Sequence, residues 1–585
     1  MKTSAVRLSS AGEMPFLEID GRPTDAAAYM TYFPENACYE DFAAAGYTLY
    51  SVCTYFTDLP INAATGFTPC ETGVFDVEGM PDFSDFDRDV EQVLRACPNA
   101  CIFPRIYISM PRWWLERYPE ETIPTPTAAG REALYSQRFR EDGAALLQQF
   151  IARTESMPYA DHIIGYQVSG GNTQEWFYFD LRGGHHAHAL PYFQEYLRRF
   201  HPGVTADVLP ELTVADGSTD EKTRLYYEFA NYEAAQTVAC MAAAAKKAVR
   251  NRKVVGAFYG YSLEVFSAGW GTHALTELLE DPNIDFFCSP VSYDQYRALG
   301  MDWCDMVPAA SVLHHGKLYF LEADIRTHRT VPMEQARPGC KLVVPYAPGV
   351  FRGGADARDD ILHLRKALAK ALTQSRSLWW FDMFGGWYHC PPVMEELTRC
   401  RRLWAQAGGE PFYESRVAVF VDETIYARYP GCGVQKALCK ELALAGLPYD
   451  VYLLADFPAV AQRYKLVLLA QPDETAETGQ WLAQTPAGVR CIRGAGMKAA
   501  ALRELAAASG VRLLTDMPDI VYAGNGCVVL HSLEGGVKTV HLPKCPRKVL
   551  DGFENAQALI VQGQTVTFSM QPLDTVLLYI DNGIK

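Results

Sequence analysis

Short apolar segments alternate with amphipathic segments over about residues 28–408 of the chain. The apolar segments are rich in β-branched and aromatic residues and have the length of strands. The intervening stretches place apolar residues three and four positions apart, as helices do. Eight strand-and-helix units are expected, with strands at residues 28–33, 47–53, 100–109, 162–169, 253–261, 284–293, 317–325 and 377–384.

Such an alternation predicts a parallel sheet covered by helices, and eight units in this length fit a (β/α)8 TIM barrel. The alternative is an open doubly wound sheet, which usually carries a glycine-rich phosphate loop after its first strand. Residues 32–46, YFPENACYEDFAAAG, contain no such loop. The pattern therefore favours an α/β fold of the barrel type.

The pattern restarts beyond the barrel. Residues 416–510 show a second, smaller series of strands and helices, of flavodoxin-like size. After about residue 511 the helical spacing disappears, and strand-like segments separated by glycine- or proline-containing turns remain. We expect a catalytic barrel at 1–410, an α/β domain at 411–512 and a small antiparallel β-domain at 513–585.

Composition narrows the classes of partner. The 585 residues are 49% hydrophobic and 21% charged, which is typical of globular proteins. A net charge of -16 argues against a general affinity for nucleic acid, so a neutral or polar small substrate is expected. The chain contains neither an apolar run of membrane-spanning length nor a secretory apolar core at its start. A cytoplasmic protein without membrane contact is the expectation.

Cysteine and histidine positions predict no metal site. The sixteen cysteines form no CxxC pair, and Cys97 and Cys101 are interpreted as two buried thiols. The HHAH stretch at residues 185–188 resembles a metal-binding loop, but solvent-exposed or substrate-facing histidines are the expected reading. We therefore expect no metal and no cofactor.

Two glutamates stand where a TIM barrel carries its chemistry, at the C-terminal ends of strands. Glu175 follows the fourth strand and Glu322 ends the seventh. Side chains alternate along a strand, so Glu322, Asp324 and Arg326 are expected to share the barrel-facing side. Buried charges are costly unless they are paired, so either a structural ion-pair layer or a catalytic site is implied.

Paired carboxylates at two strand ends suit cleavage of a glycosidic bond, with carboxyl groups about 5–5.5 Å apart in a retaining enzyme. Aromatic residues follow Glu175 and predict a raised pKa, as a proton donor needs. The nucleophile must stay ionised, and Arg326 and the Tyr293 hydroxyl are the expected partners of Glu322. Asp324 is the competing candidate for the nucleophile.

Tryptophans gather near the predicted strand ends, and apolar faces of sugar rings stack on such side chains. Each of them is equally compatible with a place in the core. Trp176 and Trp380 are the two assigned to the substrate site, beside a wider set made up of Trp113, Trp114, Trp379 and Trp387.

With Glu175 after strand four and Glu322 after strand seven, the chain resembles the retaining (β/α)8 glycosidase clan. The three-part order, and the stretch that begins VAVFVDETIYARYP, resemble glycoside hydrolase family 42 β-galactosidases and their relatives. The resemblance implies that Glu175 is the acid/base and Glu322 the nucleophile of an exo-acting β-glycosidase. It also implies a carbohydrate substrate and a homotrimer, in which Asp422 and Glu423 of the middle domain approach a neighbouring barrel.

One position departs from the clan, which usually has asparagine directly before the acid/base to reach the sugar 2-hydroxyl. Here Gln174 stands at that position, and Asn172 is an alternative source of the amide. The resemblance further makes Tyr293 the tyrosine that touches the nucleophile and Arg105 a polar anchor in the pocket. The sugar preference among β-galactoside, β-mannoside, β-glucoside and β-glucuronide stays open.

Two other classes remain. A TIM-barrel lyase or aldolase would need a lysine inside the barrel or a strand-end metal cluster, but Lys253 and Lys317 begin their strands, at the opposite end. A non-catalytic carbohydrate-binding protein would retain the fold without the chemistry.

Overall fold

The computed structural model describes most of the chain. The described residues are 6–11, 14–62, 65–125, 130–177, 187–212, 214–215, 217–293, 297–302, 304–339, 342–344, 352–374, 377–406, 416–473 and 476–581. No described helix is at once long and apolar enough to cross a membrane.

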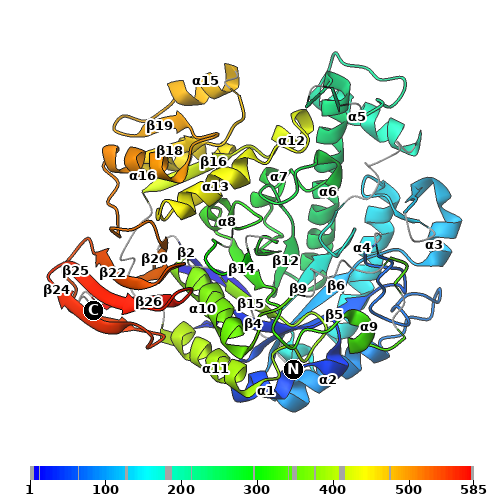
Figure 1. The fold of residues 1–585 in the computed structure, drawn as a ribbon. Coiled ribbons are helices and arrows are strands. Elements are labelled where there is room, and N and C mark those ends of the chain that lie inside the picture. Colours follow the sequence, from blue (N-terminus) through cyan, green and yellow to red (C-terminus); the bar gives the residue numbers. More distant parts are fainter. Residues whose placement is uncertain are drawn as a thin grey trace.

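A closed barrel of eight parallel strands forms the centre of the molecule (Figure 1). Each strand pairs with its neighbour in chain order, and β15 pairs with β4 to close the ring. The expected (β/α)8 barrel is therefore confirmed, although most strands are shorter than the apolar runs that predicted them. The strands are β4 (Ala27–Met30), β5 (Leu49–Tyr55), β6 (Cys101–Tyr107), β9 (Gly165–Ser169), β12 (Val254–Phe258), β13 (Phe286–Pro290), β14 (Leu318–Ala323) and β15 (Ser377–Phe381).

Helices surround this barrel, and three of the longest begin at a residue that caps them. Ser136 accepts a hydrogen bond from the Phe139 amide, and Asp220 and Asp356 cap two further helices in the same manner. The helices are α1 (Tyr39–Ala44), α2 (Ser84–Ala96), α3 (Arg112–Arg117), α4 (Gln137–Thr154), α5 (Leu190–Phe200), α6 (Glu221–Ala248), α7 (Thr276–Leu279), α8 (Ala309–His314), α9 (Met333–Ala336), α10 (Ala357–Thr373) and α11 (Pro391–Gln406).

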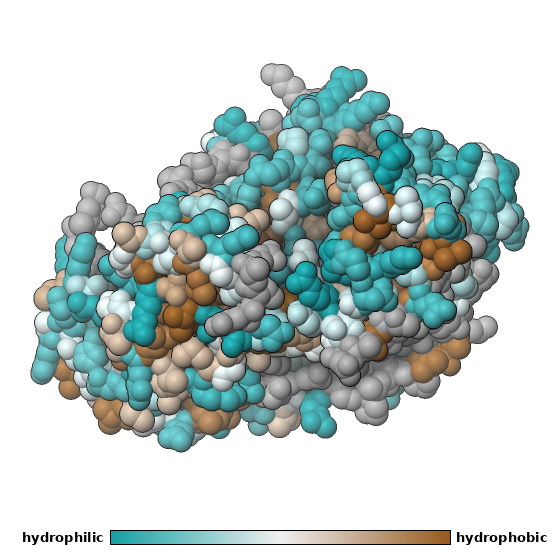
Figure 2. Space-filling model, turned by 90° about the horizontal axis from the view of Figure 1, so that it is seen from above, coloured by the Kyte–Doolittle hydropathy of each residue, from teal (hydrophilic) through white to brown (hydrophobic). Residues whose placement is uncertain are grey.

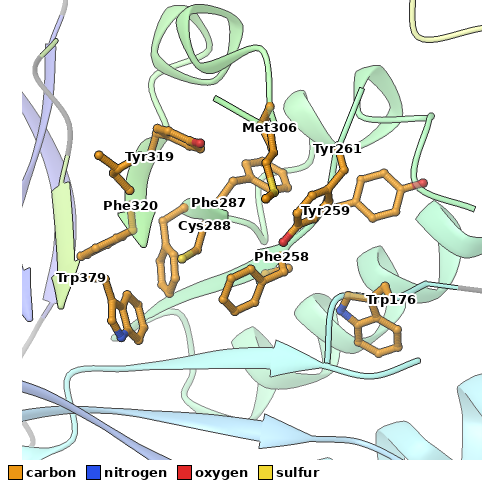
Figure 3. Packing of buried hydrophobic residues seen from close by; sticks show 14 of the residues in the cluster. Trp176, Phe258, Tyr259, Tyr261, Phe287, Cys288, Met306, Tyr319, Phe320 and Trp379 are labelled. Atoms are coloured by element: carbon orange, nitrogen blue, oxygen red, sulfur yellow. The ribbon is translucent and has the colours of Figure 1, made fainter. Parts of the chain in front are cut away.

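Large aromatic side chains fill the barrel below its C-terminal end. Phe320 lies with its ring centroid 5.3 Å from those of both Trp379 and Phe286. Gly256 makes room for this layer, because a Cβ atom there would lie 2.2 Å from the Phe286 ring. Figure 3 shows Phe258, Phe320 and Trp379 in the same buried cluster. The barrel interior is thus packed, and any site must lie above this layer.

Beyond the barrel, a four-stranded parallel sheet with the order β17-β16-β18-β19 carries helices on its flanks (Figure 1). This is the flavodoxin-like α/β unit expected from the sequence. Its strands are β16 (Val417–Val421), β17 (Asp450–Leu453), β18 (Leu466–Leu469) and β19 (Arg490–Arg493). Its helices are α12 (Ile425–Arg428), α13 (Val434–Leu444), α14 (Phe457–Val460), α15 (Ala476–Ala483) and α16 (Ala499–Ala508).

The acidic pair after β16 corrects one expectation. The Glu423 carboxylate accepts hydrogen bonds from the backbone amides of Leu275, at 2.6 Å, and Thr276, at 3.1 Å, in its own barrel. It is buried, and burial raises the pKa of Glu423 to about 7. Glu423 therefore fastens the α/β domain to the barrel of the same chain, instead of reaching a neighbouring one.

The chain closes with two small antiparallel sheets, as the alternation after residue 511 predicted. One has the order β20-β21-β26-β23 and the other β22-β25-β24, and apolar residues between them form a separate core. The strands are β20 (Ile520–Gly524), β21 (Cys527–His531), β22 (Gly536–His541), β23 (Lys548–Asp551), β24 (Gln557–Gln562), β25 (Thr565–Met570) and β26 (Thr575–Asp581). The domain limits at residues 410 and 512 stay predictions.

Short strands outside the barrel were missed by the sequence pattern. An antiparallel sheet of β1 (Val6–Ala11), β2 (Met14–Ile19) and β3 (Arg22–Pro23) precedes the barrel, and the Val6 amide bonds to Arg252, just before β12. Two further hairpins are β7 (Thr122–Ile123) with β8 (Arg131–Glu132), and β10 (Val214–Ala215) with β11 (Ser218–Thr219). Hydrophilic side chains dominate the face seen in Figure 2, where hydrophobic residues occur in small separate groups.

Candidate active site

Glu322 lies on the inner face of β14, directly above the aromatic layer. Phe320 two residues earlier packs on Trp379 inside the barrel, and Tyr319 faces outward to hydrogen-bond Ser289. This alternation confirms the face assigned to Glu322 from the sequence. Glu322 is 3% exposed, and its Oε2 atom has no hydrogen-bond partner among the described residues.

Arg105 from β6 reaches Glu322 across the barrel. The guanidinium Nη1 atom lies 3.6 Å from Glu322 Oε2, and the group stacks 4.2 Å from the centroid of the Phe258 ring. Burial nevertheless dominates and raises the pKa of Glu322 to about 8, while Arg105 lowers it and Asp324 and Glu175 raise it further. The predicted anchor Arg105 is therefore in the site, as the counter-ion of Glu322.

Asp324 has a different environment, which corrects the expected partners of Glu322. Arg326 pairs with Asp324, Arg297 lies 3.1 Å from its Oδ2 atom, and the Tyr293 hydroxyl is 3.4 Å from the same oxygen. Burial acts to raise the pKa of Asp324, but the two arginines outweigh it and lower the pKa. Arg326 and Tyr293 thus contact Asp324, the carboxylate nearer the C-terminal end of the strand, and not Glu322.

Glu175 sits in a short loop beyond β9. Its Oε1 atom accepts a hydrogen bond from the Tyr261 hydroxyl at 2.8 Å, and its Oε2 atom accepts one from Thr173. Burial raises the pKa of Glu175, although Thr173, Tyr261 and Arg105 each lower it. Within the described part of the chain, Glu175 forms no ion pair within 4 Å. A desolvated carboxyl without a counter-ion is suited to hold a proton.

The loop that carries Glu175 has an unusual backbone. Thr173, Gln174 and Trp176 have φ angles of 54°, 69° and 58°, in the left-handed region that non-glycine residues rarely enter. Such conformations persist when surrounding contacts hold them, and they concentrate at functional sites. Below the loop, the Tyr107 hydroxyl donates to Gly171 O at 2.5 Å and is itself bonded to buried Arg131.

The three loop residues assigned to substrate differ in position. Gln174 is completely buried, and within the described part of the chain neither its Oε1 nor its Nε2 atom has a hydrogen-bond partner. Asn172 is 5% exposed and pairs through its backbone with Phe177. Trp176 is fully buried and donates its indole N–H to Val168 O at 3.2 Å, so it supports the loop and offers no stacking face.

Trp380, like Trp176, does not face the site, contrary to the prediction. It alternates with inward-facing Trp379, and its indole N–H donates to the Tyr47 hydroxyl at 3.0 Å on the outer side of the barrel. The further fully buried tryptophans are Trp114, Trp379 and Trp387. The tryptophan gathering seen in the sequence is therefore mainly core packing.

Several buried polar atoms around the two glutamates lack partners. Gln167 and Ser169 face the barrel interior from β9. Their side-chain polar atoms make no hydrogen bond to any described residue, and neither does the Nε atom of Arg105. Leaving such groups unsatisfied costs about 1–3 kcal/mol each, so a ligand or water with donors and acceptors is expected there. Among the described residues, no group of three or more His, Cys, Asp or Glu is placed to hold a metal. His185 and His186 lie outside the described residues.

The fold and the site can now be compared with known proteins. No protein-family model matches the chain, and no curated protein sequence does. Solved structures do match. A β-galactosidase from Rahnella sp. R3 has a TM-score of 0.61 at 13% identity, covering 95% of this chain and 98% of that one. A β-galactosidase from the psychrophilic Marinomonas ef1 has a TM-score of 0.56 at 12% identity, covering 95% and 100%.

The chain has the fold of these β-galactosidases. A family 42 exo-carrageenase from Bacteroides ovatus is similar over 100% of this chain and 86% of its own, with a TM-score of 0.61 at 11% identity. The resemblance stated from the sequence is therefore confirmed for the fold, including its three-part order. At these identities the likeness is one of fold, so the chemistry rests on this chain's own residues.

Tyr261, Thr173 and Arg297 contact the key carboxylates and were missed. Tyr261 ends the predicted fifth strand, so the rule that drew attention to Glu322 would also have found it. Thr173 lies two residues before Glu175, but its contact depends on the left-handed loop. Arg297 follows the sixth strand in a loop, and no sequence signal relates it to Asp324.

Proposed function

We propose that this protein is a retaining, exo-acting β-glycosidase that uses Glu322 as nucleophile and Glu175 as acid/base. The observation that carries the proposal is the meeting of both glutamates at the mouth of the barrel around Arg105, among unpartnered buried polar side chains. Two carboxyl groups in unlike environments divide the labour of glycosidic bond cleavage.

Glu322 attacks the anomeric carbon and forms a glycosyl-enzyme ester, while the bond to the departing oxygen breaks. The Arg105 guanidinium stabilises the Glu322 carboxylate before the attack. It does so again once hydrolysis of the ester has regenerated that carboxylate. Asp324 is a poor alternative nucleophile, because its carboxylate is already paired with two arginines and an attack would have to break these ion pairs. It serves to fix the rim of the site.

Glu175 first donates its proton to the departing oxygen and then removes one from the incoming water. Its two hydroxyl partners, Tyr261 and Thr173, orient the carboxyl without neutralising it. Burial keeps the proton in place until the glycosidic oxygen gains negative charge. A terminal β-galactoside is the first proposed substrate, with β-mannoside, β-glucoside and β-glucuronide as alternatives.

The decisive experiment compares Glu322→Ala with Glu175→Ala on an aryl β-galactoside in azide. We expect turnover without azide to fall by at least about 10²–10⁴-fold in both variants. Azide replaces the missing nucleophile in Glu322→Ala and yields the inverted α-glycosyl azide. In Glu175→Ala, azide attacks the glycosyl-enzyme and yields the retained β-glycosyl azide.

A 2-fluoro glycoside should label the peptide that contains Glu322, and the Asp324→Asn variant is the matched control. A label on Asp324, or wild-type turnover by either alanine variant, would contradict the assignment. If a panel of aryl α- and β-glycosides gives no turnover at all, while sugars still bind, the non-catalytic class replaces this proposal. The homotrimer and the cytoplasmic location stay predictions.

A further inference from the structure

A polar cavity lies outside the barrel, between α6 and the α/β domain. It has a volume of about 150 Å³. Its lining comes from the loop after β16, from α12, from the loop after β18, and from Arg224 and Glu228 on α6. Figure 1 places α12 between this sheet and the barrel helices. The residues that line the cavity do not include Glu175 or Glu322.

Topology places this cavity at the point where α/β sheets usually bind ligands. In the order β17-β16-β18-β19, the chain leaves β16 toward one side and returns to β18 on the other. Ligands of open α/β sheets bind outside the carboxyl ends of the two strands at which the direction changes. Asp422 directly follows β16, and Gln471 comes two residues after β18, so both stand at that place.

Some polar side-chain atoms in the lining of the cavity make no hydrogen bond to any described residue, so they can bind a ligand. Asp422 uses Oδ1 to hold Thr424, while its Oδ2 atom makes no bond in the described part of the structure. Gln471 is 6% exposed, and its Oε1 atom accepts a hydrogen bond from Thr478. Its amide N–H groups have no acceptor among the described residues. Exposed Arg428 forms no ion pair within 4 Å there.

The ligand class follows from these groups. Carboxylate, amide and guanidinium heads are planar and present paired donors or acceptors, a spacing that matches neighbouring hydroxyls on a ring. Tyr429 adds an aromatic ring to the lining. A cavity of about 150 Å³ can hold a six-membered ring. A polyhydroxylated ring satisfies these conditions together.

Other ligand classes fit less well. Three carboxylates in the lining face two arginines, so an inorganic anion has no net attraction. Among the described residues no acidic cluster is placed to hold a metal. A nucleotide needs a glycine-rich turn after the first strand, but DETIYARY follows β16.

We propose that this cavity binds a single neutral hexopyranose, independently of the barrel site. Asp422 accepts from ring hydroxyls, Gln471 and Arg428 donate to them, and Tyr429 covers one face of the ring. This inference rests on the cavity and its side chains, and it stands whether or not the barrel hydrolyses glycosides.

Crystals of the full chain soaked separately in D-galactose, D-glucose and D-mannose test the location. We expect a pyranose ring in this cavity, in contact with Asp422, Arg428 and Gln471, for at least one of the three. Calorimetric titration with that sugar should show at least tenfold weaker cavity binding for Arg428→Ala. The matched control is Arg490→Ala, an exposed arginine on β19 outside the lining, which should bind as the wild type does.

Any of four results would overturn the inference. These are sugar in the barrel alone, sugar in crystals without binding in solution, an inorganic ion in the cavity, and wild-type affinity of Arg428→Ala. Aryl glycoside turnover is measured on the same two variants and should be unchanged. Failure of the wild type to turn over any glycoside would count against the proposed function only, because the titration does not depend on catalysis.

Discussion

At the residue scale, Glu322 and Asp324 show how two carboxylates on one strand acquire opposite characters. Asp324 lies beside Arg297 and Arg326, and its pKa is lowered despite burial. Among the described residues, Glu322 forms an ion pair within 4 Å only with Arg105, at 3.6 Å, and burial prevails. The number of neighbouring guanidinium groups therefore decides which carboxyl group is ionised at neutral pH, and Glu322 loses its proton only as the pH rises toward about 8.

The pH profile should report this balance. Burial raises the pKa of Glu322 to about 8, and in the proposed mechanism only the ionised form of Glu322 attacks. With a dinitrophenyl β-galactoside, whose leaving group needs no proton, log kcat/KM should rise with unit slope as pH increases toward about 8 and then level off. Removing the positive charge in Arg105→Gln should move this limb to higher pH by about 1–3 units.

The control for that profile is Glu175→Gln, which should keep the acidic limb because an activated leaving group departs without acid help. A limb near the ordinary carboxyl pKa of about 4, or one unaffected by the change at Arg105, would show that another group governs ionisation of the nucleophile.

Particular residues show how much of the site the sequence could predict. Glu175 and Glu322 were accessible because strand ends converge in a barrel and side chains alternate along a strand. The partners Tyr293 and Arg326 were misassigned, since reach across a barrel mouth depends on loop paths and side-chain length. Trp380 was misassigned because a short apolar run does not reveal which face of the strand turns inward.

At the element scale, the loop after β9 is held by what lies beneath it. The Tyr107 hydroxyl binds Gly171 O, and Arg131 binds both that hydroxyl and Glu132, at 3.0 Å from the latter. Glu132 in turn accepts from the Met110 amide. A buried ion pair thus connects β6, β8 and the loop after β9, and it supports the left-handed residues around Glu175.

Gly171→Ala should misplace Glu175, the proposed acid/base. Gly171 has φ of 64°, and a Cβ atom there would lie 2.7 Å from Phe177 O. Left-handed backbone costs a non-glycine residue about 1–2 kcal/mol, so the loop should relax and move Glu175. We expect kcat for poor leaving groups to fall about tenfold or more, with a smaller loss for a dinitrophenyl substrate.

A matched control is Gly203→Ala, where a Cβ atom meets nothing within 4 Å. Rates with a series of aryl leaving groups should become more sensitive to leaving-group pKa in Gly171→Ala only. Equal loss across the series would indicate damage to the whole barrel mouth.

Some helices and strands could be predicted from the sequence and others could not. α4 and α10 have long, regular apolar spacing, and the barrel strands are apolar runs in a repeating strand-and-helix order, so the sequence pattern reveals both. β1, β2 and β3 pair with one another before the barrel, and β7 and β8 have two residues each. Two-residue strands are too short to show any periodicity. β1 and β2 have six residues each and pair in a local hairpin, but they precede the series of strand-and-helix units from which the barrel was predicted.

At the scale of the whole molecule, one carboxylate joins the three parts. Asp302, in the barrel segment between β13 and α8, accepts from the Tyr449 hydroxyl at 3.1 Å and from the Tyr522 hydroxyl at 2.5 Å. Lys370 of α10 lies 3.4 Å from it. Tyr449 belongs to the α/β domain and Tyr522 to β20, so the contacts converge from both appended domains.

Asp302→Asn should loosen this junction. Burial would raise the pKa of Asp302, but Lys370 and Tyr522 lower it, so the carboxylate is charged and paired in the folded protein. Breaking a buried pair costs about 3–5 kcal/mol, because the remaining charge stays buried. Hydrogen exchange should therefore accelerate in β17 and β20 while the barrel strands stay protected, and the first thermal transition should shift down.

Tyr449→Phe and Tyr522→Phe are the matched controls, since each removes one hydrogen bond worth about 0.5–1.5 kcal/mol and leaves the ion pair intact. A group with a lowered folded pKa stabilises above the unfolded pKa of about 4 and loses that effect as pH falls. The difference between Asp302→Asn and wild type should thus shrink toward acidic pH. An equal difference at all pH values, or a barrel that opens together with the junction, would mean that Asp302 does not hold the three parts together through its charge.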